Sequence, residues 1–211
     1  MRLRLQPPKH IKRSTMLIIL EILFLCVSPI AILYFGAIDI HDRLWILAAY
    51  TSFVGLIVLR SHFSMKTLGM RVDNIRKDFL PYLIFTTMGV VGLLAYAHYL
   101  EQQHIQWPQT AQLFLLFLPV SFAQEFLFRS YLMHRLRQLF KSIATVVLVN
   151  AALFTFLHAM YADILINLPL AFVAGVAFAL MYYKYPNLWL ISLSHGILNF
   201  VAVYYSFFAM R

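Results

Sequence analysis

The chain has 211 residues, of which 62% are hydrophobic and only 12% are charged. A soluble domain carries roughly a quarter charged residues, so this composition excludes a water-soluble globule. The single cysteine, Cys26, excludes an internal disulfide framework and a cysteine-based metal cluster, and its apolar surroundings indicate a small buried side chain. The net charge of +9 does not indicate nucleic acid, which we do not expect as a partner, because in a membrane protein the distribution of charge is more informative than its sum.

Seven apolar segments predict an all-α, polytopic membrane helix bundle. A bilayer-spanning helix needs about 20 mainly apolar residues. The segments are, in chain order, 16–36, 44–60, 79–100, 111–133, 143–160, 164–184 and 187–208. Residues 1–15 precede them as a basic arm without a convincing cleavable signal. No repeat or linker divides residues 16–211, which we expect to form a single membrane domain.

The basic residues alternate between the connections of these segments. Fourteen of the 17 Lys and Arg residues lie in the N-terminal arm and in the second, fourth and sixth connections. Arg43 and Arg211 fall on the opposite side, and Arg129 lies inside a segment. Because cytoplasmic loops carry an excess of Lys and Arg, this pattern predicts a cytoplasmic N-terminus and, with seven spans, an external C-terminus.

The second connection has the sequence FSMKTLGMRVDNIRKDF, which mixes apolar and basic residues. Such a mixture is typical of an amphipathic helix that lies on the cytoplasmic membrane surface and is attracted to anionic lipid. A solvated basic loop is the alternative interpretation, and the sequence leaves both open.

Three of the apolar segments contain polar side chains at positions where they are costly. An ionisable residue inside a span costs at least ~2.5–3.5 kcal/mol on insertion scales, which makes it a functional hypothesis. Pairs of these residues are four apart and therefore share a helix face. The residues are Gln124, Glu125 and Arg129 in the fourth segment, Asn150, Phe154 and His158 in the fifth, and His195 and Asn199 in the seventh.

None of these polar faces can point at lipid, so we expect them to point inward and to line one polar cavity. A buried carboxylate with two histidines, an asparagine and an arginine can activate water and stabilise an oxyanion. Taken singly, each feature also has a structural interpretation. Glu125 and Arg129 could form an intrahelical ion pair, His158 could be a hydrogen-bonded structural histidine, and His195 with Asn199 could join helices.

The depths of these residues raise a geometric question. With straight helices, Glu125 and His195 lie at moderate depth, whereas His158 falls near the outer end of its segment. For the three residues to meet, either segment 143–160 starts deeper than Lys141 or segment 111–133 is broken near Pro119.

At these residues the sequence resembles the CPBP family (CAAX-processing and bacteriocin-processing enzymes, also called Abi proteins) of intramembrane proteases. The family signature is Glu-Glu-x-x-x-Arg, then Phe-x-x-x-His, then His-x-x-x-Asn or Asp. Here the corresponding stretches are QEFLFR, FTFLH and HGILN, within residues 110–205, and KTLGMR is similar to a stretch that precedes the signature in the family. The resemblance implies an endopeptidase of the bacterial cell membrane that acts on a membrane-bound or prenylated peptide or protein.

The resemblance also implies roles for individual residues. A carboxylate and His158 would activate water, His195 and Asn199 would stabilise the oxyanion, and Arg129 would keep the carboxylate charged. Gln124 and Phe154 would bind the substrate.

The chain departs from the family at one position, where Gln124 replaces the first Glu. Either Glu125 serves as the base, with Gln124 orienting water or the scissile carbonyl, or Gln124 is an engineered inactivating change. A third reading is a catalytically silent member that acts as an immunity or scaffold protein.

Other mechanisms fit the sequence less well. No HExxH and no G-x-S-x-G motif occurs in the sequence, which argues against a zincin and against a serine hydrolase. We expect no cofactor, with a zinc site formed by Glu125, His158 and His195 as the alternative. A small transporter is the remaining class, but such proteins are typically built from internal repeats, and none is detectable here.

Overall fold

The computed structural model describes residues 14–37, 39, 42–61, 63–102, 109–161 and 163–208, with only the backbone for residues 109–115. No strand occurs within these ranges, so the all-α prediction is confirmed. The helical elements are α1 (Thr15–Tyr34), α2 (Arg43–Arg60), α3 (Ile75–Tyr99), α4 (Gln109–Glu125), η2 (Phe126–Leu132), α5 (Met133–Leu139), α6 (Ile143–Phe156), α7 (Ile164–Lys184) and α8 (Leu188–Tyr204). The predicted basic arm, residues 1–15, lies outside the described residues except for Ser14 and Thr15.

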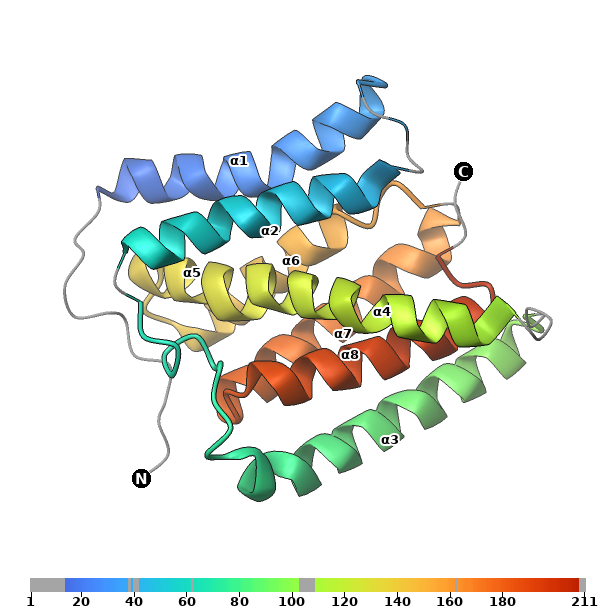
Figure 1. The fold of residues 1–211 in the computed structure, drawn as a ribbon. Helices are drawn as coiled ribbons and strands as arrows, with labels where there is room; N and C mark the ends of the chain where they lie inside the picture. The colour runs from blue at the N-terminus through green and yellow to red at the C-terminus, as the bar shows by residue number, and fades with distance from the viewer. Residues whose placement is uncertain are drawn as a thin grey trace.

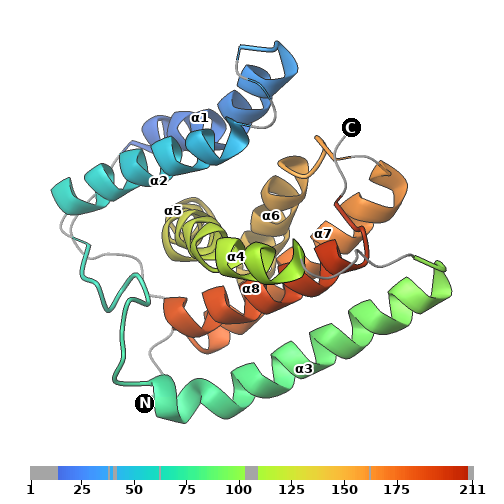
Figure 2. The ribbon, with the colours of Figure 1, turned by 45° about the vertical axis from the view of Figure 1, so that its right-hand side comes forward.

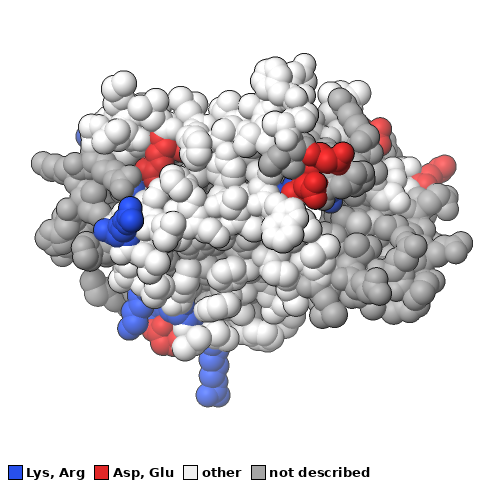
Figure 3. Space-filling view, turned by 45° about the horizontal axis from the view of Figure 1, so that its top comes forward, with Lys and Arg blue, Asp and Glu red and all other residues white. Residues whose placement is uncertain are grey.

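The helices form a membrane bundle. By length and composition α1, α2, α3 and α7 can each cross a bilayer, whereas α6 and α8 are apolar but shorter. The face of the molecule in Figure 3 is uncharged over most of its described surface, as expected for lipid contact. Because α4, η2 and α5 follow one another without a break, the described helices make seven rods, one at each predicted segment.

The rod formed by α4, η2 and α5 lies at the centre of the bundle (Figures 1 and 2). The α1–α2 hairpin lies on one side of this rod and α3 on the other. The closest packing joins α4 to α8, α6 to α7 and α3 to α8, so the C-terminal half of the chain forms the core of the bundle.

Side-chain caps explain where three of the helices begin. Ser14 accepts a hydrogen bond from the Leu17 N–H before α1, and Ser142 accepts one from the Thr145 N–H before α6. Asn187 accepts one from the Leu190 N–H, at 3.0 Å, before α8. Each cap satisfies a donor that the first helical turn leaves without a partner.

The central rod corrects two sequence expectations. The fourth predicted segment ended at residue 133, but the helix runs on to Leu139, and it also continues through Pro119 without a break. The continuation is polar, and it remains helical because Arg135 finds buried partners. Its Nε lies 3.5 Å from Oε2 of Glu21 in α1, and the same side chain donates to the Tyr131 hydroxyl.

The longer rod resolves the question of depth. Glu125 lies about 14 residues before the end of α5, and His158 lies about 15 residues after the start of α6. At about 1.5 Å per residue, both lie roughly 20 Å from the turn that joins the two helices. Segment 143–160 therefore does not start deeper than expected, and its helix ends at Phe156, two residues before His158.

The connection between α2 and α3 is not an amphipathic helix, and only part of it is solvated. Residues 63–74 form turns, in which the Leu68 side chain is fully buried. The Leu68 carbonyl accepts hydrogen bonds from the Ser130 hydroxyl at 2.7 Å and from the Tyr182 hydroxyl at 2.8 Å. Since buried backbone groups need hydrogen-bond partners, these two hydroxyls allow the Leu68 backbone to be buried against η2 and α7.

Candidate active site

Glu125 is the centre of a buried charge cluster. It is the last residue of α4, and its side chain is inaccessible to solvent. Its Oε1 lies 2.7 Å from Nδ1 of His195 on α8, and its Oε2 lies 3.4 Å from Nε of Arg129. The carboxylate therefore accepts one short hydrogen bond from the histidine and makes one looser charge contact with the arginine.

A π-helical segment positions Arg129. From Phe126 to Leu132 the chain takes up π-helical geometry, which widens the turn that follows Glu125. The Phe128 carbonyl accepts hydrogen bonds from the Met133 N–H and, at 2.9 Å, from Nδ2 of Asn150 on α6. Single π-helical turns inside α-helices occur frequently at functional sites. Asn150 thus supports the widened turn with its side-chain amide, a role that its polarity alone did not reveal.

The Arg129 guanidinium is enclosed by aromatic rings. Its Cζ lies 4.6 Å from the ring centroid of Phe154 and 5.6 Å from that of Phe178. Its Nη2 donates a hydrogen bond of 3.4 Å to the Gly175 carbonyl. Ring faces attract a cation, so the buried charge is balanced by Glu125 and by two aromatic neighbours.

Phe154 connects the remaining polar groups. Its ring centroid lies 4.5 Å from that of His158 and 5.9 Å from that of His195. Nδ1 of His158 lies 2.8 Å from the Phe154 carbonyl oxygen. A carbonyl oxygen only accepts, so Nδ1 carries the hydrogen and Nε2 of the neutral ring is left as an acceptor.

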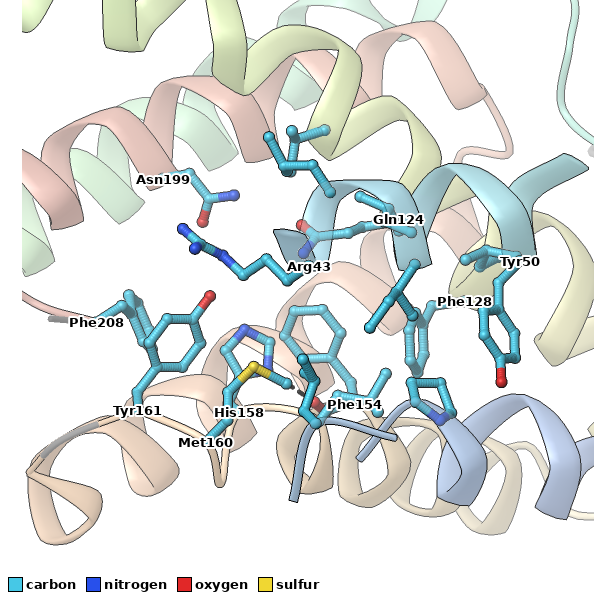
Figure 4. A pocket seen from close by; sticks show the side chains of 18 of the residues that line it. Arg43, Tyr50, Gln124, Phe128, Phe154, His158, Met160, Tyr161, Asn199 and Phe208 are labelled. Atoms are coloured by element: carbon cyan, nitrogen blue, oxygen red, sulfur yellow. Dashed lines mark hydrogen bonds between the residues drawn. The ribbon is translucent and has the colours of Figure 1, made fainter. Parts of the chain in front are cut away.

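Two cavities meet at this group of residues. The first has a volume of about 290 Å³ and lies between the α1–α2 hairpin and the central rod, with Gln124 and Arg43 in its lining (Figure 4). The second has a volume of about 510 Å³ and is lined by α3, α7 and α8, including His195. Four side chains line both cavities and form the wall between them: Phe154, His158, Asn199 and Phe208.

The structure brings the predicted residues together, but not around one polar cavity. Glu125 and Arg129 are in direct contact, yet neither lines either of these two cavities; they lie buried behind His195. Asn199 is half-buried and donates a hydrogen bond of 3.3 Å to the hydroxyl of Ser121 on α4. Gln124 lines the first cavity, and its buried Oε1 accepts no hydrogen bond from the described residues.

Four residues near the site were not identified as site residues from the sequence. Asn150 was seen only as a polar residue in an apolar segment and Arg43 only as a charge on the minority side. Ser121 and Tyr161 gave no signal, because a hydroxyl is common in apolar helices. Among the described residues, no three His, Cys, Asp or Glu side chains are grouped so that they could hold a metal ion.

A family model described as Type II CAAX prenyl endopeptidase, Rce1-like, matches residues 105–201. This range contains all three stretches in which the family resemblance was seen. Residues 105–201 are therefore similar to the CAAX protease (CPBP) family, in agreement with the resemblance of the three stretches. The match to a membrane protease family agrees with the apolar helices, so the protein is an integral membrane protein. Comparison with curated proteins and with solved structures gave no match.

Proposed function

We propose that this protein is an intramembrane endopeptidase that cleaves a membrane-associated peptide or protein with histidine-activated water. The observation that carries the proposal is the short hydrogen bond between Glu125 and His195, in a cluster that includes His158 and borders two cavities. The match of residues 105–201 to a protease family supports the reaction class, hydrolysis of a peptide bond.

In this proposal His158 is the general base. Its Nε2 is an acceptor at the wall between the cavities, where it would take a proton from water as the water attacks the scissile carbonyl. It would return this proton to the leaving amine as the C–N bond breaks. A positioned base of this kind contributes roughly 10²- to 10⁴-fold to rate. Gln124, whose amide oxygen is buried in the lining of the first cavity, would accept a hydrogen bond from the water or from the substrate N–H.

His195 and Asn199 would stabilise the oxyanion. The carboxylate of Glu125 holds Nδ1 of His195 and so orients the ring; as an imidazolium, the ring would donate its Nε2–H to developing negative charge. The sequence favoured Glu125 as the base. Its burial behind His195 supports a different role, that of a positioning residue that acts through the histidine.

A silent family member is the second candidate, and Gln124 is the observation that favours it. Gln124 occupies the position of the family's first Glu and lines the same cavity as His158, where a carboxylate would accept a proton. A protein inactive for this reason would bind its partner without cleaving it, as an immunity or scaffold protein does. We favour the active protease, because the Glu125–His195–Arg129 cluster is complete.

The active protease and the silent member predict different cleavage rates for four proteins, the parent and three variants, on one substrate. The probe is a membrane-reconstituted peptide with a farnesylated cysteine three residues before its C-terminus. We expect the parent to cleave it and Glu125→Gln to lose most of kcat while KM changes little. Glu125→Asp should recover part of kcat, because a carboxylate is present again. An inert parent that becomes active as Gln124→Glu would establish the silent member instead.

We also propose that hydrolysis does not depend on a metal. Chelation by phenanthroline should then leave the rate unchanged. A rate lost on chelation and restored by Zn²⁺ would instead establish a zinc site that includes Glu125, His158 and His195.

The proposed location is a bacterial inner membrane, as the family resemblance implies, with residues 16–211 as one membrane domain. The N-terminal arm would be cytoplasmic, because fourteen of the 17 basic residues lie on that side. Reporter fusions after Glu101 and Asp163 should then report the outside. A cytoplasmic signal at Glu101 would contradict this orientation.

A further inference from the structure

Arg43 is a charged residue in an otherwise largely apolar cavity. It is the first residue of α2 and lines the first cavity together with Gln124, His158 and Asn199. Among the described residues that line this cavity, it is the only Lys, Arg, Asp or Glu. A permanent positive charge therefore borders the same space as the histidine that we propose as the base.

Neither the helix nor the membrane orientation explains an arginine at this position. Cations are favourable at the C-terminus of a helix, whereas Arg43 lies at the N-terminus of α2. It is also one of two basic residues on the side that the charge pattern assigns to the outside, where Lys and Arg are scarce. Residues that break local rules in this way are expected at functional sites.

The side chain extends into the cavity next to the reactive groups. Figure 4 shows Arg43 reaching across the cavity, in this view between the side chains of Asn199 and His158. Arg43 interacts with the hydroxyl of Tyr161, whose ring centroid lies 5.6 Å from that of His158. The guanidinium is thus placed near His158 by a neighbour that contacts both.

We propose that Arg43 recognises the free C-terminal carboxylate of the peptide substrate. The inference rests on the proposed function and adds to it a reason why cleavage would occur close to a C-terminus. A guanidinium presents a planar pair of donors that matches a carboxylate, and such a charge-assisted contact is strongest in a site that excludes water. Arg43 lies outside residues 105–201, the range that the family model matches.

The test compares two forms of one farnesylated peptide, with either a free C-terminal carboxylate or a C-terminal amide. For the parent, kcat/KM for the free acid should exceed that for the amide by about ten- to a hundredfold, the effect of one hydrogen-bonded charge. Arg43→Gln should remove this preference by lowering kcat/KM for the free acid alone. Arg43→Lys should keep part of it. Arg60→Gln, at the opposite end of α2, is the matched control and should keep all of it.

Two results would overturn the inference. One is an equal loss for both peptides in Arg43→Gln, which would assign the residue to structure. The other is a parent that does not distinguish the two peptides. If the parent cleaves neither peptide, the proposed function fails, and binding of the two fluorescently labelled peptides then decides the role of Arg43. Tighter binding of the free acid that is lost in Arg43→Gln supports recognition, and equal binding refutes it.

Discussion

The centre of the bundle and its flanks bury very different side chains. The central rod and the helices behind it enclose Glu125, Arg129 and Asn150, none of which is exposed. The flanking helices bury mainly a narrow apolar row, such as Ile18, Ile22 and Cys26 in α1, and turn large apolar side chains outward. The two cavities lie where the flanks meet the centre. The candidate catalytic residues therefore lie in the buried centre of the molecule, while the flanks shape the space that a substrate would enter.

The largest contrast should appear in catalysis. His195→Ala, in the centre, should lower kcat by roughly 10²- to 10⁴-fold, because it removes the donor that Glu125 positions. His98→Ala, at the exposed end of α3, should leave the rate unchanged. Initial rates on the farnesylated peptide measure both. Comparable losses in the two variants would remove the distinction between centre and flank.

Stability should follow the same division. Arg129→Leu leaves the Glu125 carboxylate buried beside a hydrocarbon side chain, which should cost about 3–5 kcal/mol of unfolding free energy. Arg60→Gln, at the exposed end of α2, should change it by less than about 0.5 kcal/mol. Chemical denaturation in detergent gives both values. The double variant Glu125→Gln with Arg129→Leu should recover part of the loss, and strict additivity would argue against the pair.

Two glycines with similar positive φ should show a smaller difference in stability between a packed position and an open one. Gly69 and Gly36 both have positive φ, at +71° and +67°. A Cβ at Gly69 would collide with the Tyr182 hydroxyl, whereas one at Gly36 would meet nothing within 4 Å. Gly69→Ala should therefore cost about 1–3 kcal/mol, and Gly36→Ala only the backbone part, about 1 kcal/mol. Thermal denaturation of both variants tests this. Equal losses of stability would mean that Tyr182 does not pack closely against Gly69.

The smallest effect should come from filling the second cavity. Gly92 faces this cavity, and a Cβ there would meet nothing within 4 Å, so Gly92→Leu should stabilise α3 by less than about 1 kcal/mol. If the substrate binds in the first cavity, where Gln124 and Arg43 lie, kcat/KM for the farnesylated peptide should stay the same. A loss greater than tenfold would assign substrate binding to the second cavity.

The sequence predicted the parts of this protein that obey simple energetic rules. Apolar length located the seven segments, and the high cost of polar groups in lipid singled out Glu125, Arg129, His158, His195 and Asn199 as candidate site residues before any geometry was known. That Glu125 faces His195, and that Arg129 is enclosed by aromatic rings, requires the packing of α4, α7 and α8. Spacing within one helix cannot supply this information.

Other features left no readable pattern. The energy difference between a π-helical and an α-helical turn is small, and contacts such as that of Asn150 decide between the two. The stretch QEFLFRSYL therefore does not predict the π-helical turn. The polar stretch after residue 133 predicted the end of the helix. Its continuation could not be predicted, because the partner of Arg135 lies more than a hundred residues earlier, at Glu21. Arg43 was visible only as an exception to a charge pattern, and its direction into the first cavity required the structure.

The Leu68 carbonyl has a consequence for the order in which the bundle assembles. One of its two donors, Tyr182, lies 114 residues further along the chain. During synthesis the connection between α2 and α3 is therefore complete in sequence long before the helix that holds it exists. Until α7 is made, the buried Leu68 carbonyl lacks one of its two hydrogen-bond donors. The first half of the protein is thus synthesised early but reaches its final packing only after α7 is made. A chain truncated before α7 would lack the hydrogen bond from Tyr182 to the Leu68 carbonyl.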